Sequence, residues 1–350
     1  MPKTNLLGFT AAQLEGLMLS LGERAFHGRQ LFKWFYKLRQ YDFSRITDLS
    51  RDLRTRLAEG YDFRGLTSEH TMLSQDGTRK FLFRLDDGLA IESVLIPEEV
   101  GRKTVCISSQ VGCPLGCAFC ATGKMGGGRN LTVGEIVGQL IFLRDQYGED
   151  AFTNIVLMGM GEPLLNFDNV IEAVKIISAG DGLSVAAKKV TISTAGIIPV
   201  IRRLADMKLK VRLAVSLNAA LQEKRLRIMP LAKKYPLGQL AEVLKYYTDV
   251  TRFRVTFEYI LFAGFNDTMD DVMALSHLIR GIPCKINLLA YNPVEGLEFE
   301  RPSEEAVDWF AKQLYPRAPA VTVRRSRGTD IDAACGQLAA KQRKRRQKDA

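Results

Sequence analysis

The stretch KTVCISSQVGCPLGCAFC, residues 103–120, joins a short apolar, β-branched run to a loop that contains three cysteines. Downstream of it, similar runs alternate with segments of helical periodicity. These runs lie at 104–108, 154–158, 189–194, 211–217, 254–260 and 285–291. Strands that alternate with helices indicate a parallel sheet with a helical outer layer. We therefore predict an α/β fold of six βα units, either open or closed into a barrel, with a seventh strand at 321–325 on one edge.

The chain before this core shows two other patterns. Apolar side chains recur at helical spacing over 11–21, 27–38 and 48–58. Two strand-like runs at 78–85 and 89–95 flank Asp86-Asp87-Gly88, which predicts a β-hairpin. We therefore divide the chain into a helical accessory domain (1–65), a β-hairpin linker (66–100), a core (101–340) and a basic tail (341–350).

The composition excludes several classes of protein. Of 350 residues, 46% are hydrophobic and 25% are charged, so the chain is not disordered over most of its length. No run of apolar residues is long enough to span a membrane, and the N-terminus has no apolar signal core. We therefore expect a cytoplasmic protein without a membrane partner. We also expect a monomer, although nothing in the sequence determines the oligomeric state.

The positive charge is concentrated at the C-terminus. The formal net charge is +10, and the last ten residues hold six basic side chains and one acid. Arg324, Arg325 and Arg327 form a second basic cluster. A basic tail fits a polyanionic partner, nucleic acid before membrane, although a solvated tail without a partner would have the same composition.

Four of the six cysteines fall within fifteen residues. Cys113, Cys117 and Cys120 have the spacing C-x3-C-x2-C in one loop. Three such thiolates can hold three irons of a [4Fe-4S] cluster and leave the fourth iron open to another ligand. Zinc is the competing metal, but no histidine lies near this loop in the sequence. Cys284, ahead of a buried strand, fits the core.

Further polar residues occur where the predicted strands end. In parallel α/β folds, chemistry occurs at the carboxyl ends of the strands. The cysteine loop follows the first strand, and small or polar residues follow four others. These are Gly159–Pro163 after the second strand, Ser193 at the third, Ser216-Leu217-Asn218 at the fourth and Asn292 after the sixth.

Three motifs together carry a family resemblance. The C-x3-C-x2-C loop resembles that of the radical S-adenosylmethionine superfamily. Met158-Gly159-Met160-Gly161-Glu162-Pro163 and the segment DIDAACGQL, residues 330–338, are similar to the RlmN/Cfr family of RNA adenine methyltransferases. The resemblance implies a partial (β/α)6 TIM-like radical SAM barrel with an N-terminal helical accessory domain. It also implies a [4Fe-4S] cluster on Cys113, Cys117 and Cys120, and two molecules of S-adenosylmethionine per turnover.

The resemblance further implies a covalent mechanism. Cys335 takes a methyl group from one S-adenosylmethionine. A second molecule is then cleaved reductively to a radical, which activates the S-methyl carbon for addition to the adenine ring. Glu92, in a segment similar to the family's Glu-x-Val-x-Ile-Pro, accepts a proton at the modified carbon. Cys106 attacks the sulfur of Cys335, which releases the methylated RNA and leaves a transient disulfide.

The same resemblance assigns the cofactor pocket. Gly161 and Glu162 would receive the amino group of S-adenosylmethionine, since a carboxylate suits an ammonium. The carboxylate, ribose and adenine would be held by strand-end residues, namely Ser193, Ser216, Leu217, Asn218 and Asn292. Position 218 departs from the pattern, because many relatives carry histidine there.

The implied substrates are an adenine in 23S rRNA and, for dual-specificity members, the adenine beside the anticodon of certain tRNAs. An external electron donor and a disulfide reductant are implied as partners. Two other functions fit the same residues. One is methylation at adenine C8, of the Cfr type, and the other is a non-catalytic iron-sulfur RNA-binding protein, which would leave Cys106, Glu162 and Cys335 without a role.

Overall fold

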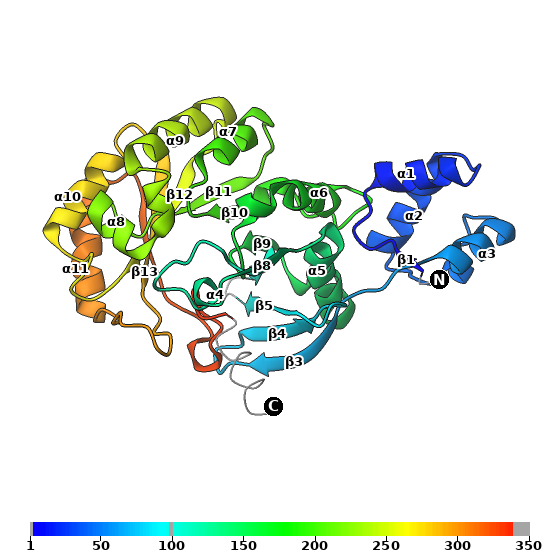
Figure 1. Cartoon of the computed structure of the whole chain (residues 1–350), viewed down its shortest axis with the longest axis horizontal. Helices are drawn as coiled ribbons and strands as arrows, with labels where there is room; N and C mark the ends of the chain where they lie inside the picture. The colour runs from blue at the N-terminus through cyan, green and yellow to red at the C-terminus, as the bar shows by residue number, and fades with distance from the viewer. Residues whose placement is uncertain (1–2, 98–100, 339–350) are drawn as a thin grey trace.

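The computed structural model describes residues 3–97 and 101–338 (Figure 1). The predicted basic tail at 341–350 lies outside these residues. All six predicted βα strands form, and neighbours along the chain pair in parallel. They are β6 (Lys103–Cys106), β9 (Asn154–Leu157), β10 (Val190–Thr194), β11 (Arg212–Ser216), β12 (Val255–Leu261) and β13 (Cys284–Ala290). The predicted edge strand is β14 (Val321–Arg324), parallel to β13.

The sheet is open and continues beyond the parallel strands. Its order is β14-β13-β12-β11-β10-β9-β6-β5-β4-β3, so β14 and β3 are its edges. The predicted hairpin is confirmed as β4 (Arg79–Arg84) and β5 (Ala90–Pro97), and β5 joins the core by antiparallel pairing with β6. β3 (Thr67–Leu73) was not predicted. Most of its residues are exposed, so it lacks the alternation of apolar and polar residues that marks a half-buried strand.

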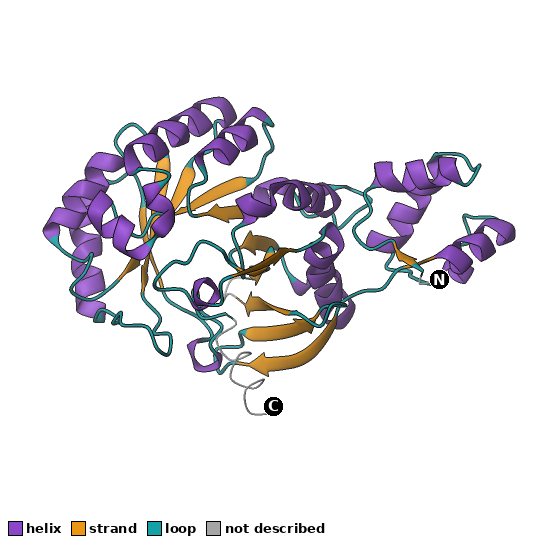
Figure 2. Cartoon of the chain, viewed as in Figure 1, coloured by secondary structure: helices purple, strands orange, loops and turns teal. Residues whose placement is uncertain are grey.

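Helices cover the outer face of the parallel strands (Figure 2). They are α5 (Val133–Tyr147), α6 (Phe167–Ser178), α7 (Ile198–Asp206), α8 (Gln222–Ile228), α9 (Leu237–Thr251), α10 (Met269–Leu278) and α11 (Glu304–Leu314). The first turn of α5 has a capping box, in which Thr132 and Glu135 satisfy each other's backbone N–H groups. Throughout residues 3–97 and 101–338, none of the helices has the length and apolar character needed to cross a bilayer.

The three predicted N-terminal helices form a separate unit at one end of the molecule (Figure 1). They are α1 (Ala11–Ser20), α2 (Phe26–Tyr36) and α3 (Arg51–Gly60). The short strands β1 (Thr4–Asn5) and β2 (Tyr61–Asp62) pair in parallel and close the unit. Polar contacts attach it to α5, because the Tyr41 hydroxyl donates to the Asp145 carboxylate at 2.9 Å.

Candidate functional site

A cavity lies at the carboxyl ends of the parallel strands. Nine of the predicted site residues line it, namely Cys113, Cys117, Cys120, Gly161, Glu162, Ser193, Ser216, Asn218 and Cys335. They come from five separate parts of the chain. The topology therefore gathers residues that the sequence shows only as strand ends and one C-terminal motif.

The three clustered cysteines share one loop between two short elements. The loop follows β7 (Gln110–Gly112), which pairs with β8 (Gly127–Asn130), and it runs into the short helix α4 (Ala121–Lys124). The Cys113 N–H donates to the Gly126 carbonyl at 2.9 Å, so the loop is closed at its base. Burial raises the pKa of the Cys113 thiol to about 12 and also raises the pKa of Cys117 and Cys120.

These thiols suit a cluster in which each sulfur binds a different iron. Within the described ranges, no group of three His, Cys, Asp or Glu side chains is placed to hold a metal ion. A single zinc ion would need ligands that converge on one point. A [4Fe-4S] cluster instead spreads its ligands over several irons, and three thiols along one cavity wall are compatible with that arrangement.

Glu162 is one of two buried acids that line the cavity. Its carboxylate accepts hydrogen bonds from the backbone N–H groups of Ala195 at 2.7 Å and Leu164 at 3.0 Å. Burial outweighs these bonds and raises the pKa of Glu162 to about 7. Gly161 precedes it with φ 98°, and a Cβ at this position would lie 2.5 Å from the Gln110 side chain. Only glycine therefore lets the loop approach Gln110 so closely.

The strand-end residues take two kinds of position. Ser193 and Ser216 line the cavity directly. Leu217 flanks it, with its carbonyl accepting a hydrogen bond from Arg225 Nε at 3.1 Å. Asn218 has φ 58°, a conformation that asparagine tolerates better than most residues. Its Oδ1 accepts from the Ile260 N–H at 3.2 Å, so the side chain is bonded within the protein.

Cys335 reaches the cavity because contacts from distant parts of the chain hold its segment. Asn292 Nδ2 donates to the Cys335 carbonyl at 3.5 Å. On the other side, the Ala121 N–H donates to the Gly336 carbonyl at 2.8 Å, which places the segment beside α4 (Figure 1). Ser74, in the turn between β3 and β4, donates to Asp330 at 2.6 Å. The motif is therefore held between the β3–β4 turn, the cysteine loop and the end of β13.

Cys106 and Glu92 lie on neighbouring strands behind this segment. Cys106 ends β6 opposite Val94 of β5, and Glu92 lies two residues before Val94 on the same strand, hence on the same face. Both Cys106 and Cys335 are free thiols. Burial raises the pKa of Cys106 to about 12, and Cys335 is near enough to raise it as well.

Three charged residues near the site were missed at the sequence level. Lys80 Nζ is 3.4 Å from Glu92 Oε1 and donates to the Asp332 carbonyl at 3.2 Å. Glu258 lines the cavity from β12, with its carboxylate accepting from Asn287 Nδ2 at 2.8 Å. Arg225, on α8, is fully buried. Glu258 could have been found from the sequence, because it is a charged residue inside an apolar strand run. Arg225 could not, because in the sequence it is like any surface residue of a polar helix.

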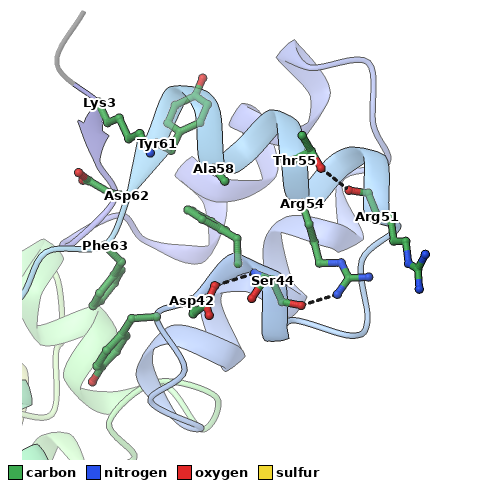
Figure 3. Close-up of a pocket in the computed structure, with 12 residues that line it drawn as sticks. Lys3, Asp42, Ser44, Arg51, Arg54, Thr55, Ala58, Tyr61, Asp62 and Phe63 are labelled. Atoms are coloured by element: carbon green, nitrogen blue, oxygen red, sulfur yellow. Dashed lines mark hydrogen bonds between the residues drawn. The ribbon is translucent and has the colours of Figure 1, made fainter.

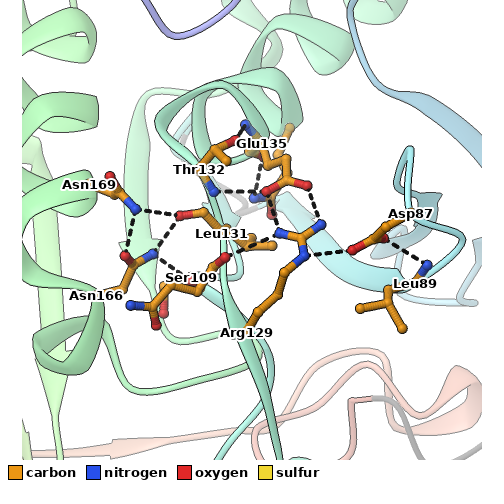
Figure 4. A network of polar contacts seen from close by, with 11 residues as sticks. Asp87, Leu89, Ser109, Arg129, Leu131, Thr132, Glu135, Asn166 and Asn169 are labelled. Atoms are coloured by element: carbon orange, nitrogen blue, oxygen red, sulfur yellow. Dashed lines mark hydrogen bonds and ion pairs between the residues drawn. The ribbon is translucent and has the colours of Figure 1, made fainter.

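A polar network links the turn of the β4–β5 hairpin to β8, the short strand that follows the cysteine loop (Figure 4). Arg129, on β8, bonds Asp87 through Nε at 2.6 Å and Glu135 through Nη2 at 2.7 Å. Nearby, Asn166 Nδ2 donates to the carbonyls of Ser109 and Leu131, each at 2.8 Å. The strand that carries Glu92 and the loop that carries the cysteines are thus held in one rigid frame.

Known proteins share both parts of this architecture. Residues 107–276 match the radical SAM superfamily, and residues 4–61 match the ribosomal RNA large subunit methyltransferase N-terminal domain. The dual-specificity RNA methyltransferase RlmN of Geobacter sulfurreducens is 46% identical over 337 residues, which cover 96% of this chain and 92% of that protein. Its namesake in Geotalea uraniireducens is 44% identical, with 97% of each chain covered.

A solved structure agrees with these sequence matches. The crystal structure of a radical SAM methyltransferase from Sphaerobacter thermophilus superposes with a TM-score of 0.90 at 42% identity, and the match covers 97% of this chain and all of that one. The shared fold includes both the sheet that forms the cavity and the N-terminal helical unit. The chain therefore belongs to the RlmN family of radical S-adenosylmethionine methyltransferases.

Proposed function

We propose that this protein methylates C2 of an adenine in 23S rRNA and of the anticodon-adjacent adenine in tRNAs. The relatives it matches are named dual-specificity RNA methyltransferases. The observation that carries the proposal is the placement of Cys335 in the same cavity as Cys113, Cys117 and Cys120. A cysteine that only packed in the core would not need to be delivered to the cofactor cavity by a separate C-terminal segment.

Each side chain has a role in this proposal. Cys113, Cys117 and Cys120 bind the cluster, while Glu162 and the strand-end residues orient S-adenosylmethionine. When bound, the cluster and S-adenosylmethionine would supply the reductive cleavage that activates a methyl carbon. Two molecules of S-adenosylmethionine would be used per turnover. An external low-potential donor provides the electron.

The chain's own residues carry the methyl group through the rest of the reaction. The Cys335 sulfur would take the methyl group by displacement from the sulfonium of S-adenosylmethionine, which leaves as the thioether. After this methyl group loses one hydrogen atom to the radical, its carbon would bond to adenine C2. Glu92 removes the proton from C2. The Cys106 thiolate would attack the Cys335 sulfur, and the bond from that sulfur to the transferred carbon would break. The carbon would take up a proton to become a methyl group, and the unpaired electron left from the radical step would return to the electron-donor side. The Cys106–Cys335 disulfide that remains is reduced by an external dithiol.

RNA binding falls to the N-terminal unit and the basic tail. The part of this unit from residue 3 to 65 contains an open cleft of about 790 Å³ (Figure 3). Its lining includes the cations Lys3, Arg51 and Arg54, the acids Asp42 and Asp62, and Tyr61. Cations can contact phosphates, and a tyrosine ring can stack on an unpaired base. We extend the proposal to the domain boundaries at 65, 100 and 340, to a monomeric state, and to the cytoplasm, where both RNAs reside.

The test identifies the methylated nucleoside. We would reconstitute the cluster without oxygen, add S-adenosylmethionine, a reductant and a 23S rRNA fragment, and compare the digested RNA with authentic 2-methyladenosine by mass spectrometry. We expect 2-methyladenosine from the wild type and none from Cys335→Ala. Detection of 8-methyladenosine would show that the enzyme methylates C8 instead of C2. If no methylated adenine forms, a non-catalytic RNA-binding protein would be favoured.

A further inference from the structure

Arg225 is a buried cation whose hydrogen bonds do not account for its charge. It is fully buried on α8. Nε donates to the Leu217 carbonyl at 3.1 Å, and Nη2 donates to the Ala195 carbonyl at 2.6 Å. The third nitrogen, Nη1, has no hydrogen-bond partner among residues 3–97 and 101–338. Both bonds go to neutral carbonyls, and a buried charge without a counter-charge is costly.

The position of Arg225 places this charge against the cysteine loop. The N–H of Ala118, between Cys117 and Cys120, donates to the Ile228 carbonyl at the end of α8 at 2.9 Å. Phe119 packs in one apolar cluster with Ile228 and Met229. The helix that carries Arg225 is therefore attached directly to the loop.

The two carbonyls that Arg225 contacts also border the cofactor pocket. Ala195 donates its N–H to Glu162, and Leu217 lies between Ser216 and Asn218 of the cavity wall. Arg225 thus lies behind the wall and is bonded to two strand ends, on a helix whose last residue, Ile228, is hydrogen-bonded to the neighbour of Cys117. Glu162 is committed to backbone N–H groups and forms no bond to this guanidinium in the described ranges.

A cluster on these cysteines would provide the missing counter-charge. A cluster bound by three thiolates is anionic, and it gains another negative charge when it is reduced. The net charge around an iron-sulfur cluster is one of the factors that set its reduction potential. A fixed cation in a region of low dielectric constant stabilises the more negative, reduced form.

We propose that Arg225 is a positioning residue that balances the charge of the iron-sulfur cluster at Cys117 and raises its reduction potential. The inference rests on the proposed cluster ligands Cys113, Cys117 and Cys120. It adds a residue outside the cysteine motif, from a helix about a hundred positions later in the chain, to the set that controls the cluster.

The test is a redox titration of the reconstituted full-length protein, with dithionite as reductant and the reduced cluster measured by electron paramagnetic resonance. Arg225→Gln keeps N–H donors for the two carbonyls but removes the charge, so we expect a more negative midpoint potential. Arg225→Lys keeps the charge and should stay near the wild type. Arg227→Gln is the matched control, because it removes an exposed charge from the same helix.

The outcomes separate a charge effect from a structural one. The inference is overturned if Arg225→Gln leaves the potential unchanged, or shifts it no more than Arg227→Gln does. If Arg225→Gln fails to retain iron, then retention by Arg225→Lys supports the need for a charge, and loss from both variants overturns it. A wild type that binds no cluster, or a Cys117→Ala variant that binds one normally, would instead refute the proposed ligands.

Discussion

The cysteine loop and the Cys335 segment meet in one cavity but are built in different ways. The loop is local, because its three thiols lie within eight residues and a backbone bond between Cys113 and Gly126 closes its base. The Cys335 segment is held by residues from far away in the chain, including Ser74, Asn292 and Ala121. The proposed cluster ligands are therefore encoded by short-range spacing, whereas the placement of Cys335, the proposed methyl carrier, depends on the completed tertiary structure.

The largest expected effect tests the local half of this comparison. Cys117→Ala should abolish the iron absorbance of the reconstituted protein, because the loop would keep only two of the thiolates that the cluster needs. Cys284→Ala is the matched control, since Cys284 is buried in the core away from the cavity, and it should retain iron. Equal iron contents in both variants would show that the loop is not the ligand set.

The next effect tests the tertiary half through stability. Lys80→Met removes the ammonium that pairs with the buried Glu92 carboxylate, and losing one member of a buried ion pair costs about 3–5 kcal/mol. Lys80→Met combined with Glu92→Gln removes both charges and should recover part of that loss. Chemical denaturation of four proteins measures it, namely the wild type, Lys80→Met, Glu92→Gln and the double variant. Additive losses in the double variant would mean that the pair is not coupled.

The third effect concerns cofactor affinity and pH. Burial raises the pKa of Glu162 to about 7, and only its ionised form attracts the ammonium of S-adenosylmethionine. Binding should therefore tighten by about tenfold between pH 6 and pH 8, as the carboxylate loses its proton. Calorimetry under anaerobic conditions checks this. Glu162→Gln should bind more weakly with no such pH dependence, and a parallel slope in that variant would assign the dependence to another group.

The smallest effect concerns one contact that pins the Cys335 segment. Asp330→Ala removes the hydrogen bonds from the Ser74 hydroxyl and the Gln75 N–H. Because the other contacts of the segment remain, we expect methylation to slow by only about two- to fivefold. Iron content should not change. Loss of iron together with activity would mean that the two halves of the site are less independent than their construction indicates.

Sequence patterns predicted the site best where the information is local. Strand ends, the C-x3-C-x2-C spacing and the capping box at Thr132 each depend on a few neighbouring residues, and all lie where they were expected. Motifs also singled out Cys106, Glu92 and Cys335, but not how they come together. Lys80 links Glu92 to Asp332, and that link spans more than two hundred residues, beyond the reach of any periodicity.

The sequence by itself determined that the chain forms a parallel α/β core, and that a cysteine loop follows the first strand of this core. Alternation of apolar runs with helical segments is a short-range property, so it could be read directly. Only the tertiary structure decided that the sheet stays open, that β3 adds an edge, and that Arg225 lies buried beside the cysteine loop. Those features depend on which distant surfaces pack together. The free energy of that packing depends on residues from several segments, so no single segment predicts it.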